Sequence, residues 1–234
     1  MPNKNTKMIQ TLAYGLGDLL NKIVLIGGSV LDFYVTDPSA PETLPTDDID
    51  AVVKVDSMLE YKHFEQSLIE KGFERKDGEN TLIKTWIYNG VKLNITPIHT
   101  DQIGFHNRWY EEGTFHSFSY PINDYLSVRI FNPVYYLASK VEAFLNRGGK
   151  DFRTSEDFQD IVYLLDNRPE IEQETKKGFY QVREYIQTNF QRLLKNVDLE
   201  EGICYALPYG LEDDGTEKIR NQMERIAGVE YSFQ

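Results

Sequence analysis

The strongest constraint on the fold is a short apolar run that ends in a glycine turn. Residues 23–26 read Ile-Val-Leu-Ile and are followed by Gly27-Gly28-Ser29. Consecutive apolar residues bounded by glycines are typical of a buried strand, and residues 30–34 have a helical pattern. We therefore predict a strand, a tight turn and the start of a helix. In this arrangement backbone N–H groups can approach an anionic ligand closely.

A second predicted strand, residues 49–55, opens with an acidic pair. Side chains i and i+2 of a strand share a face, so Asp48 and Asp50 lie on the same side while Ile49 points into the core. Two carboxylates placed in this way can bridge two Mg²⁺ ions. A glycine turn beside them would seat a triphosphate, with the Ser29 hydroxyl bonded to a phosphate oxygen. The two features together predict in-line nucleotidyl transfer.

The connection between the glycine turn and the acidic strand is long. Eighteen residues separate Ser29 from Asp48, and three prolines fall within residues 36–46. Proline removes a backbone donor and disfavours both helix and sheet interiors. We expect this segment to be a loop that folds away from the site or forms a lid over it.

Periodicity and turn signals predict the remaining elements. Asn89-Gly90 separates two alternating runs and is the strongest hairpin signal in the chain. The aromatic residues Trp109 and Tyr110 fall in a predicted loop, residues 99–124, where they stack a base or cover the sheet. The predicted strands are 81–88, 91–98 and 126–131, and the predicted helices are 6–20, 57–71, 132–146, 154–166, 178–195 and 217–227. This order indicates an α+β fold, with a mixed sheet and flanking helices in residues 1–131 and a helical region, residues 132–234, packed on that core.

One of the C-terminal helices combines an apolar stripe with two acidic residues. Thr154-Ser155 supplies its N-terminal cap. Asp157 and Asp160 lie together on a flank of the apolar face, because residues three apart are neighbours on a helix. The stripe consists of Phe158, Ile161, Val162 and Leu165.

Composition narrows the classes of function. The chain has 234 residues, with 25 Lys and Arg against 37 Asp and Glu, giving a formal net charge of −12. Phosphate repulsion therefore opposes a general role in coating nucleic acids. No apolar stretch reaches the length of a membrane helix, and the single Cys204 cannot form an internal disulfide. We expect a cytoplasmic protein with no membrane partner.

The glycine turn followed by Asp48-Ile49-Asp50 resembles the signature of the polymerase-β-like nucleotidyltransferase superfamily. Residues 135–168 (YYLASKVEAFLNRGGKDFRTSEDFQDIVYLLDNR) resemble the lysine-bearing helix and the Asp-x-x-Asp helix of the AbiEii/AbiGii toxin nucleotidyltransferases. The resemblance spans about residues 23–168. It implies a polymerase-β-like mixed sheet with flanking helices and a helical C-terminal half.

The resemblance also implies a toxin-like activity. The protein would move a nucleoside monophosphate from a nucleoside triphosphate (NTP) to a hydroxyl of an RNA end or a protein, and a companion antitoxin would be its partner. Mg²⁺ or Mn²⁺ would be held by Asp48 and Asp50, with Asn94 as a third ligand. The nucleotide would be bound by Gly27, Gly28, Ser29, Lys140 and Arg147. Catalytic roles fall to Asp48, Asp50, Lys140, Asp157 and Asp160, the last two orienting the acceptor or supporting the lysine.

Asn94 is a departure from the superfamily pattern, because related sequences tend to have Asp at this point of the strand. Asn cannot act as a base, and it offers a metal only one neutral carbonyl oxygen. Three explanations stay open: another group such as Asp157 serves, the nucleophile needs little activation, or the site binds nucleotide without turnover. The last would make the chain a non-catalytic nucleotide-binding or interaction module. A further alternative is an enzyme that modifies a small molecule such as an antibiotic, because an acidic surface favours a cationic acceptor.

Overall fold

The computed structural model describes residues 2–76, 84–98, 107–147, 151–208 and 212–228. The chain forms two compact units, the first from residues 1–33 and 42–132 and the second from residues 34–41 and 133–234. No helix within the described residues is long and apolar enough to cross a membrane.

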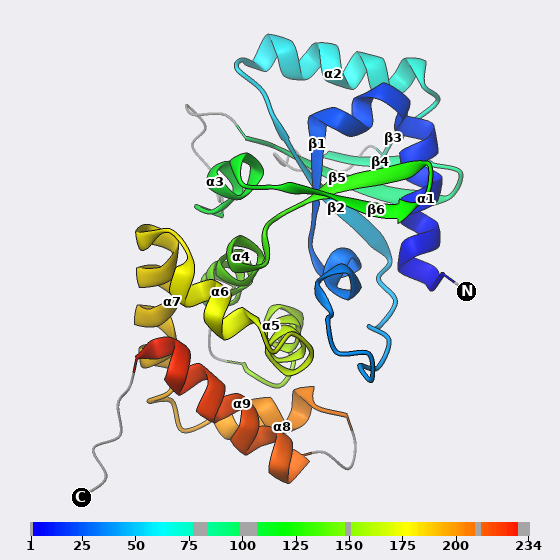
Figure 1. Ribbon diagram of the computed structural model, residues 1–234. Coiled ribbons are helices and arrows are strands. Elements are labelled where there is room, and N and C mark those ends of the chain that lie inside the picture. The colour runs from blue at the N-terminus through cyan, green and yellow to red at the C-terminus, as the bar shows by residue number, and fades with distance from the viewer. Residues whose placement is uncertain (1, 77–83, 99–106, 148–150, 209–211, 229–234) are drawn as a thin grey trace, which may run out of the picture. The chain divides into compact units, whose positions relative to one another are not determined.

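The first unit is built on a mixed sheet (Figure 1). Seven strands of the described chain lie in the order β3-β4-β5-β2-β1-β7-β6. β2 pairs in parallel with β5, and β1 pairs in parallel with β7, while the other neighbours are antiparallel. The strands are β1 (Ile23–Ile26), β2 (Asp48–Lys54), β3 (Glu74–Arg75), β4 (Lys84–Tyr88), β5 (Val91–Ile98), β6 (Phe118–Asn123) and β7 (Leu126–Ile130).

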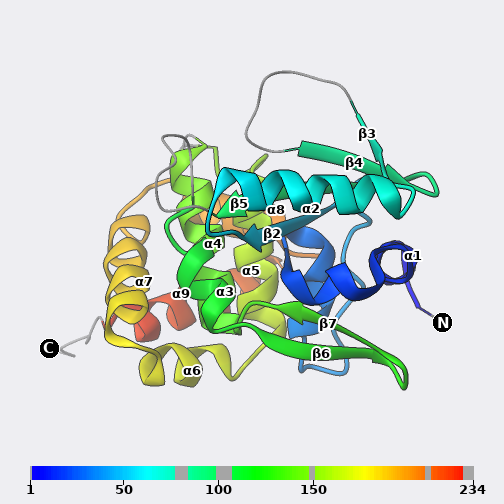
Figure 2. The same cartoon turned by 90° about the horizontal axis from the view of Figure 1, so that it is seen from above.

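Helices and 3-10 turns complete the first unit. α2 lies over one face of the sheet (Figures 1 and 2) and buries Tyr61, Phe64 and Leu68. The Ser57 hydroxyl caps it as predicted, accepting a hydrogen bond from the backbone N–H of Glu60. The elements are α1 (Lys4–Leu16), α2 (Met58–Glu70), α3 (Tyr110–Phe115) and the 3-10 turns Gly17–Lys22 and Gly28–Tyr34, the last residue of which belongs to the second unit.

The hairpin between β4 and β5 forms at the predicted dipeptide. Asn89 and Gly90 both have positive φ angles, 48° and 78°, as a two-residue hairpin turn of the primed type requires. This turn fixes the register, so that Thr85 of β4 stands opposite Asn94 of β5.

Two elements lie where the sequence predicted a loop over residues 99–124, of which residues 99–106 lie outside the described part of the chain. β6 is an edge strand, and an edge tolerates the missing N–H of Pro121. α3 is short and has no side-chain cap, so it carried no start signal. Trp109, just before it, is 6% exposed and packs in the core. A base therefore finds little of its ring surface free for stacking.

The second unit is helical in its described residues after 133. Its core is an aromatic cluster in which the rings of Phe144, Phe152 and Phe158 lie 4.8 to 5.2 Å apart. The predicted apolar stripe of α5 is buried throughout. α6 and α8 were not predicted. The helices are α4 (Pro133–Asn146), α5 (Glu156–Asn167), α6 (Ile171–Lys177), α7 (Tyr180–Leu193), α8 (Leu199–Ala206) and α9 (Glu212–Ala227).

The segment 34–41 belongs to the second unit, although the sequence placed it in the first domain. The backbone N–H groups of Thr36 and Asp37 donate to the carbonyl oxygen of Asn167, at 3.1 and 3.2 Å. Arg168 donates to the carbonyl oxygen of Tyr34 at 2.7 Å. Two backbone hydrogen bonds and one from the Arg168 guanidinium thus tie this segment to the end of α5. The packing of the helical region on the core stays a prediction.

Candidate functional site

The acidic pair opens β2 at the centre of the sheet. Ile49 is completely buried on one face, and Asp48 and Asp50 are half-buried on the other. Asp50 pairs with Ile26 of β1 on one side and with Asn94 of β5 on the other. The sheet therefore brings the end of β1, the start of β2 and the middle of β5 together.

Gly27 sets the glycine turn directly against this pair. Its φ angle is +80°, a backbone conformation that other residues rarely adopt. A Cβ atom at this position would lie 2.7 Å from Oδ2 of Asp50. Only glycine allows the backbone to approach the carboxylate so closely.

Ser29 lies in the same turn, and its side-chain hydroxyl is in an unusual environment. It is 2% exposed, and its hydroxyl has no hydrogen-bond partner within the described chain. An unsatisfied buried hydroxyl is unfavourable, so such a group is explained best by a ligand or water that it meets. The turn continues as a seven-residue 3-10 helix, Gly28–Tyr34, where the sequence suggested an ordinary helix start. A phosphate bound here would therefore be held by the Ser29 hydroxyl and the backbone of the turn rather than by a helix dipole.

Asn94 bonds to both members of the pair. Its Nδ2 donates to Oδ2 of Asp48 at 2.9 Å and to Oδ1 of Asp50 at 3.1 Å. Its carbonyl oxygen, which we expected to be a metal ligand, accepts a hydrogen bond from the Thr85 hydroxyl at 2.8 Å. No motif in the sequence points to Thr85, because its contact with Asn94 depends on the register of the hairpin. No group of three or more His, Cys, Asp or Glu side chains that could hold a metal occurs among the described residues.

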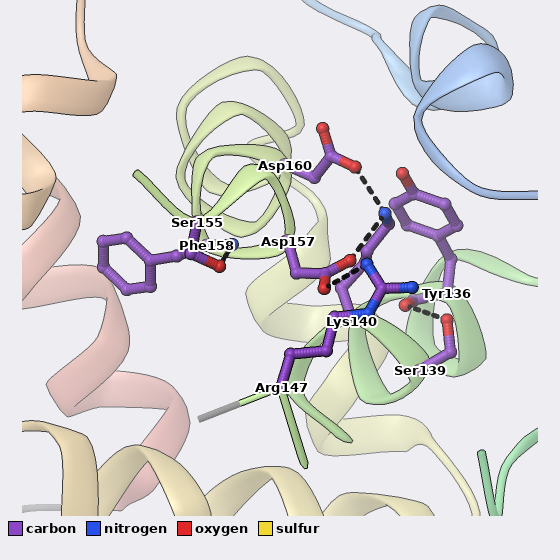
Figure 3. Close-up of polar contacts among 8 residues, drawn as sticks. All are labelled: Tyr136, Ser139, Lys140, Arg147, Ser155, Asp157, Phe158 and Asp160. Atoms are coloured by element: carbon purple, nitrogen blue, oxygen red, sulfur yellow. Dashed lines mark hydrogen bonds and ion pairs between the residues drawn. The ribbon is translucent and has the colours of Figure 1, made fainter. Parts of the chain in front are cut away.

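A second polar cluster joins α4 and α5 in the second unit (Figure 3). Lys140 Nζ lies 3.1 Å from Oδ1 of Asp157 and 2.6 Å from Oδ2 of Asp160. Arg147 Nη1 lies 3.0 Å from the other oxygen of Asp157. The Ser155 hydroxyl caps α5 by accepting from the N–H of Phe158, as predicted, and so fixes the start of the acidic helix.

The Lys140 ammonium is buried and compensated. Burial alone would lower the pKa of Lys140, but the carboxylates of Asp160 and Asp157 outweigh burial and hold that pKa above its ordinary value. The ring of Tyr136 lies 5.9 Å from the ammonium, and burial with nearby Asp160 raises the pKa of its hydroxyl. The lysine is thus a permanent cation whose charge is already matched. The Arg147 side chain, by contrast, is 66% exposed.

The predicted site residues therefore fall into two groups. Gly27, Ser29, Asp48, Asp50 and Asn94 come together in the first unit. The lysine, arginine and two aspartates around α5 come together in the second. A joint role for the two groups stays a prediction.

A cavity of about 620 Å³ lies in the first unit around Val53, Lys54 and Val55, at the other end of β2 from the acidic pair. Its charged lining is mainly basic, from Lys22, Lys54 and Arg129. It contains none of the predicted site residues.

Comparison with solved structures identifies the fold. A scan against protein-family models gave no match, and a search of curated proteins gave none. The solution structure of the antibiotic-resistance factor ANT(2″)-Ia matches with a TM-score of 0.50 at 13% sequence identity, over 82% of this chain and 94% of that chain. The chain has the fold of this antibiotic-resistance factor. The crystal structure of ANT(2″)-Ia in complex with adenylyl-2″-tobramycin matches with a TM-score of 0.49 at 13% identity, over 81% and 99% of the two chains. The predicted fold class, a nucleotidyltransferase-like mixed sheet with flanking helices and a helical C-terminal half, is confirmed.

Proposed function

We propose that the protein is a metal-dependent nucleotidyltransferase that moves a nucleoside monophosphate from an NTP to a hydroxyl acceptor. The carrying observation is the acidic pair, Asp48 and Asp50, on one face of β2 against a turn in which Gly27 leaves no room for a Cβ atom. The shared fold with ANT(2″)-Ia supports the same activity. In the reaction the acceptor oxygen bonds to the α-phosphorus as the bond to pyrophosphate breaks, and the hydroxyl proton passes to water.

The two carboxylates fit a hard divalent cation. Oxygen donors without sulfur or imidazole favour Mg²⁺ or Mn²⁺ over softer metals. Asp48 and Asp50 would hold the cation, which neutralises charge on the phosphates when bound. The backbone at Gly27 and Gly28 and the Ser29 hydroxyl would seat the triphosphate. A phosphate oxygen would give that buried hydroxyl the partner it lacks in the described chain.

The cluster on α4 and α5 would act on the nucleotide through Arg147. Lys140 is held by two carboxylates, so we assign Asp157 and Asp160 the role of supporting the lysine. Lys140 in turn neutralises the negative charge of Asp157 and Asp160 on α5. The second oxygen of Asp157 contacts Arg147 and so orients its guanidinium. The exposed guanidinium has donors left for a phosphate oxygen.

The resemblance to the AbiEii/AbiGii toxins favours an RNA end or a protein as acceptor, and an antitoxin as partner. A second candidate acceptor is a polyhydroxylated cationic small molecule. It is favoured by the net charge of −12 and by the shared fold with an antibiotic-resistance factor. A non-catalytic nucleotide-binding module remains the rival, motivated by Asn94.

The test is a labelling reaction with each of the four α-³²P NTPs and Mg²⁺ or Mn²⁺. Separate arms contain cellular RNA, cellular protein, or cationic aminosugars such as tobramycin. Asp48→Ala/Asp50→Ala removes the pair, and Asp47→Ala is the matched control, because Asp47 is the 91%-exposed neighbour that lies outside β2.

Label that needs Asp48 and Asp50 but not Asp47 supports the proposal and names the acceptor class. Label that survives loss of the pair, or no label in any arm together with metal-dependent nucleotide binding, contradicts it. The second result would favour the binding module.

A further inference from the structure

We propose that Asn94 is a lock on the acidic pair: its amide NH₂ group takes the place of a cation between Asp48 and Asp50 and must be displaced before a divalent metal binds. This inference rests on the proposed function and concerns the regulation of the same site. It replaces the expectation that Asn94 is simply a third metal ligand.

The geometry of the amide is that of a cation substitute. Both N–H bonds of Nδ2 are used, one on each carboxylate, at 2.9 and 3.1 Å. Hydrogen bonds to ionised acceptors are stronger than neutral ones, and here they hold together two like charges that would otherwise repel. A metal bound by the same carboxylates must therefore displace these hydrogen bonds.

Thr85 fixes the direction of the amide. Its hydroxyl donates to Oδ1 of Asn94 at 2.8 Å across the β4–β5 pair. If the amide turned over, its carbonyl oxygen would face two carboxylates, and the Thr85 hydroxyl would have to accept instead of donate. The metal-free orientation is thus held from both ends.

The lock and the ligand interpretations predict opposite effects of Asn94→Ala. Without the amide, a metal no longer competes with two charge-assisted hydrogen bonds, so the lock predicts tighter binding. If the carbonyl were a ligand, its loss would weaken binding. Each hydrogen bond to a charged group corresponds to at least about tenfold in an equilibrium constant, so tenfold is the lower bound for losing both.

The experiment measures Mn²⁺ binding to the full chain by EPR of the free ion, with no nucleotide present. We compare wild type with Asn94→Ala, Asn94→Asp, Thr85→Val and Thr96→Val. Asn94→Asp is nearly isosteric and adds a carboxylate, so it reports whether the site binds Mn²⁺ at all. Thr96→Val is the matched control, because Thr96 shares the face of β5 with Asn94 and no hydrogen bond joins it to the acidic pair within the described chain.

We expect Asn94→Ala to bind Mn²⁺ at least about tenfold more tightly than wild type. Thr85→Val should bind more tightly by a smaller factor, because the amide is freed to turn, and Thr96→Val should match wild type. Weaker or unchanged binding by Asn94→Ala overturns the lock.

The outcomes separate the lock from the proposed function. Tighter binding by Asn94→Ala without nucleotidyl transfer by any variant would support the lock and contradict the proposed enzyme activity. Nucleotidyl transfer by wild type together with weaker Mn²⁺ binding by Asn94→Ala would support the proposed enzyme activity and contradict the lock. Failure of every variant to bind Mn²⁺, Asn94→Asp included, overturns both.

A second readout needs no paramagnetic ion. In the metal-free chain the side-chain NH₂ of Asn94, assigned by its absence in Asn94→Ala, should exchange slowly with solvent in ¹⁵N spectra. Saturation with Mg²⁺ should release it, so that exchange becomes faster. An amide that exchanges freely without metal contradicts the lock.

Discussion

The ammonium group of Lys140 lies 2.6 Å from a carboxylate oxygen of Asp160, and the buried carboxylate of Asp157 shares the same cation. Removing one partner of a buried ion pair leaves the other charge uncompensated, which is far less favourable than losing an exposed pair. The cluster therefore contributes to the stability of the second unit, in addition to any role in binding a ligand.

We predict that Lys140→Met destabilises the second unit by about 3–5 kcal/mol, because half-buried Asp160 loses its cation and buried Asp157 keeps only the exposed Arg147. The control is Lys177→Met, an exposed lysine at the end of α6. Hydrogen exchange of α4 and α5 measures the effect. Tryptophan fluorescence does not, because Trp86 and Trp109 both lie in the first unit. Unchanged exchange with impaired nucleotide binding would instead make the lysine a phosphate contact.

Ser29→Ala should change stability and binding in opposite directions. Removing a buried hydroxyl that lacks a partner is expected to stabilise the first unit by up to about 1 kcal/mol, while nucleotide affinity falls about tenfold. Urea denaturation followed by tryptophan fluorescence and nucleotide titration give the two values. Ser67→Ala is the control, since its hydroxyl donates to the carbonyl oxygen of His63 on α2. A loss of stability with full affinity would show that the Ser29 hydroxyl is structural.

Gly27→Ala tests the close approach of the turn to Asp50. Both Gly27 and Gly90 have φ near +80°, so an alanine at either position costs about 1–2 kcal/mol of backbone strain. Only at Gly27 would the new Cβ meet a neighbour, the Asp50 carboxylate, since Gly90 has open space around it. We expect both variants to lose stability but only Gly27→Ala to lose Mn²⁺ binding and transfer. Equal activity of the two variants would show that the turn at Gly27 is not part of the active site.

Acid should weaken the contact between α6 and α9. Glu172 accepts from Arg225 at 2.8 Å and from Lys176 at 2.7 Å. Burial would raise the pKa of Glu172, but these two hydrogen bonds outweigh it and hold the pKa below its ordinary value of 4.5. A carboxyl whose folded pKa is lowered contributes stability above its unfolded pKa and loses that contribution as the pH falls through the folded value.

The measurement is hydrogen exchange of α6 and α9 at pH 7 and near pH 4. Wild type should lose protection at the lower pH, and Glu172→Gln should lose less between the two. Glu217→Gln on the exposed side of α9 should behave like wild type. Equal acid sensitivity of all three would place the titrating group elsewhere.

Short sequence signals correctly predicted those features of the fold that depend on interactions between residues close together in the sequence. The apolar run 23–26, the caps at Ser57 and Ser155 and the Asn89-Gly90 turn depend on neighbours within a few residues, and each was found where the sequence placed it. The common face of Asp48 and Asp50 follows from strand alternation alone.

The contacts of Asn94 were not predictable in the same way. Its place beside Asp50 depends on the parallel pairing of β2 with β5, and Thr85 reaches it only in one register of the hairpin. The direction of the amide is decided by three partners from two other strands. A residue-by-residue reading identifies an amide in place of a carboxylate, but not which end of that amide faces the pair.

The attachment of residues 34–41 to the end of α5 bears on how the protein is made. During synthesis this segment leaves the ribosome before all of residues 42–132, and its partners on Asn167 and Arg168 follow still later. The second unit therefore cannot finish folding until the first has been fully translated. A gene cut after residue 132 separates the helical region from part of its own structure, so the smallest independently expressible form of that unit must carry residues 34–41 as a fused or added peptide.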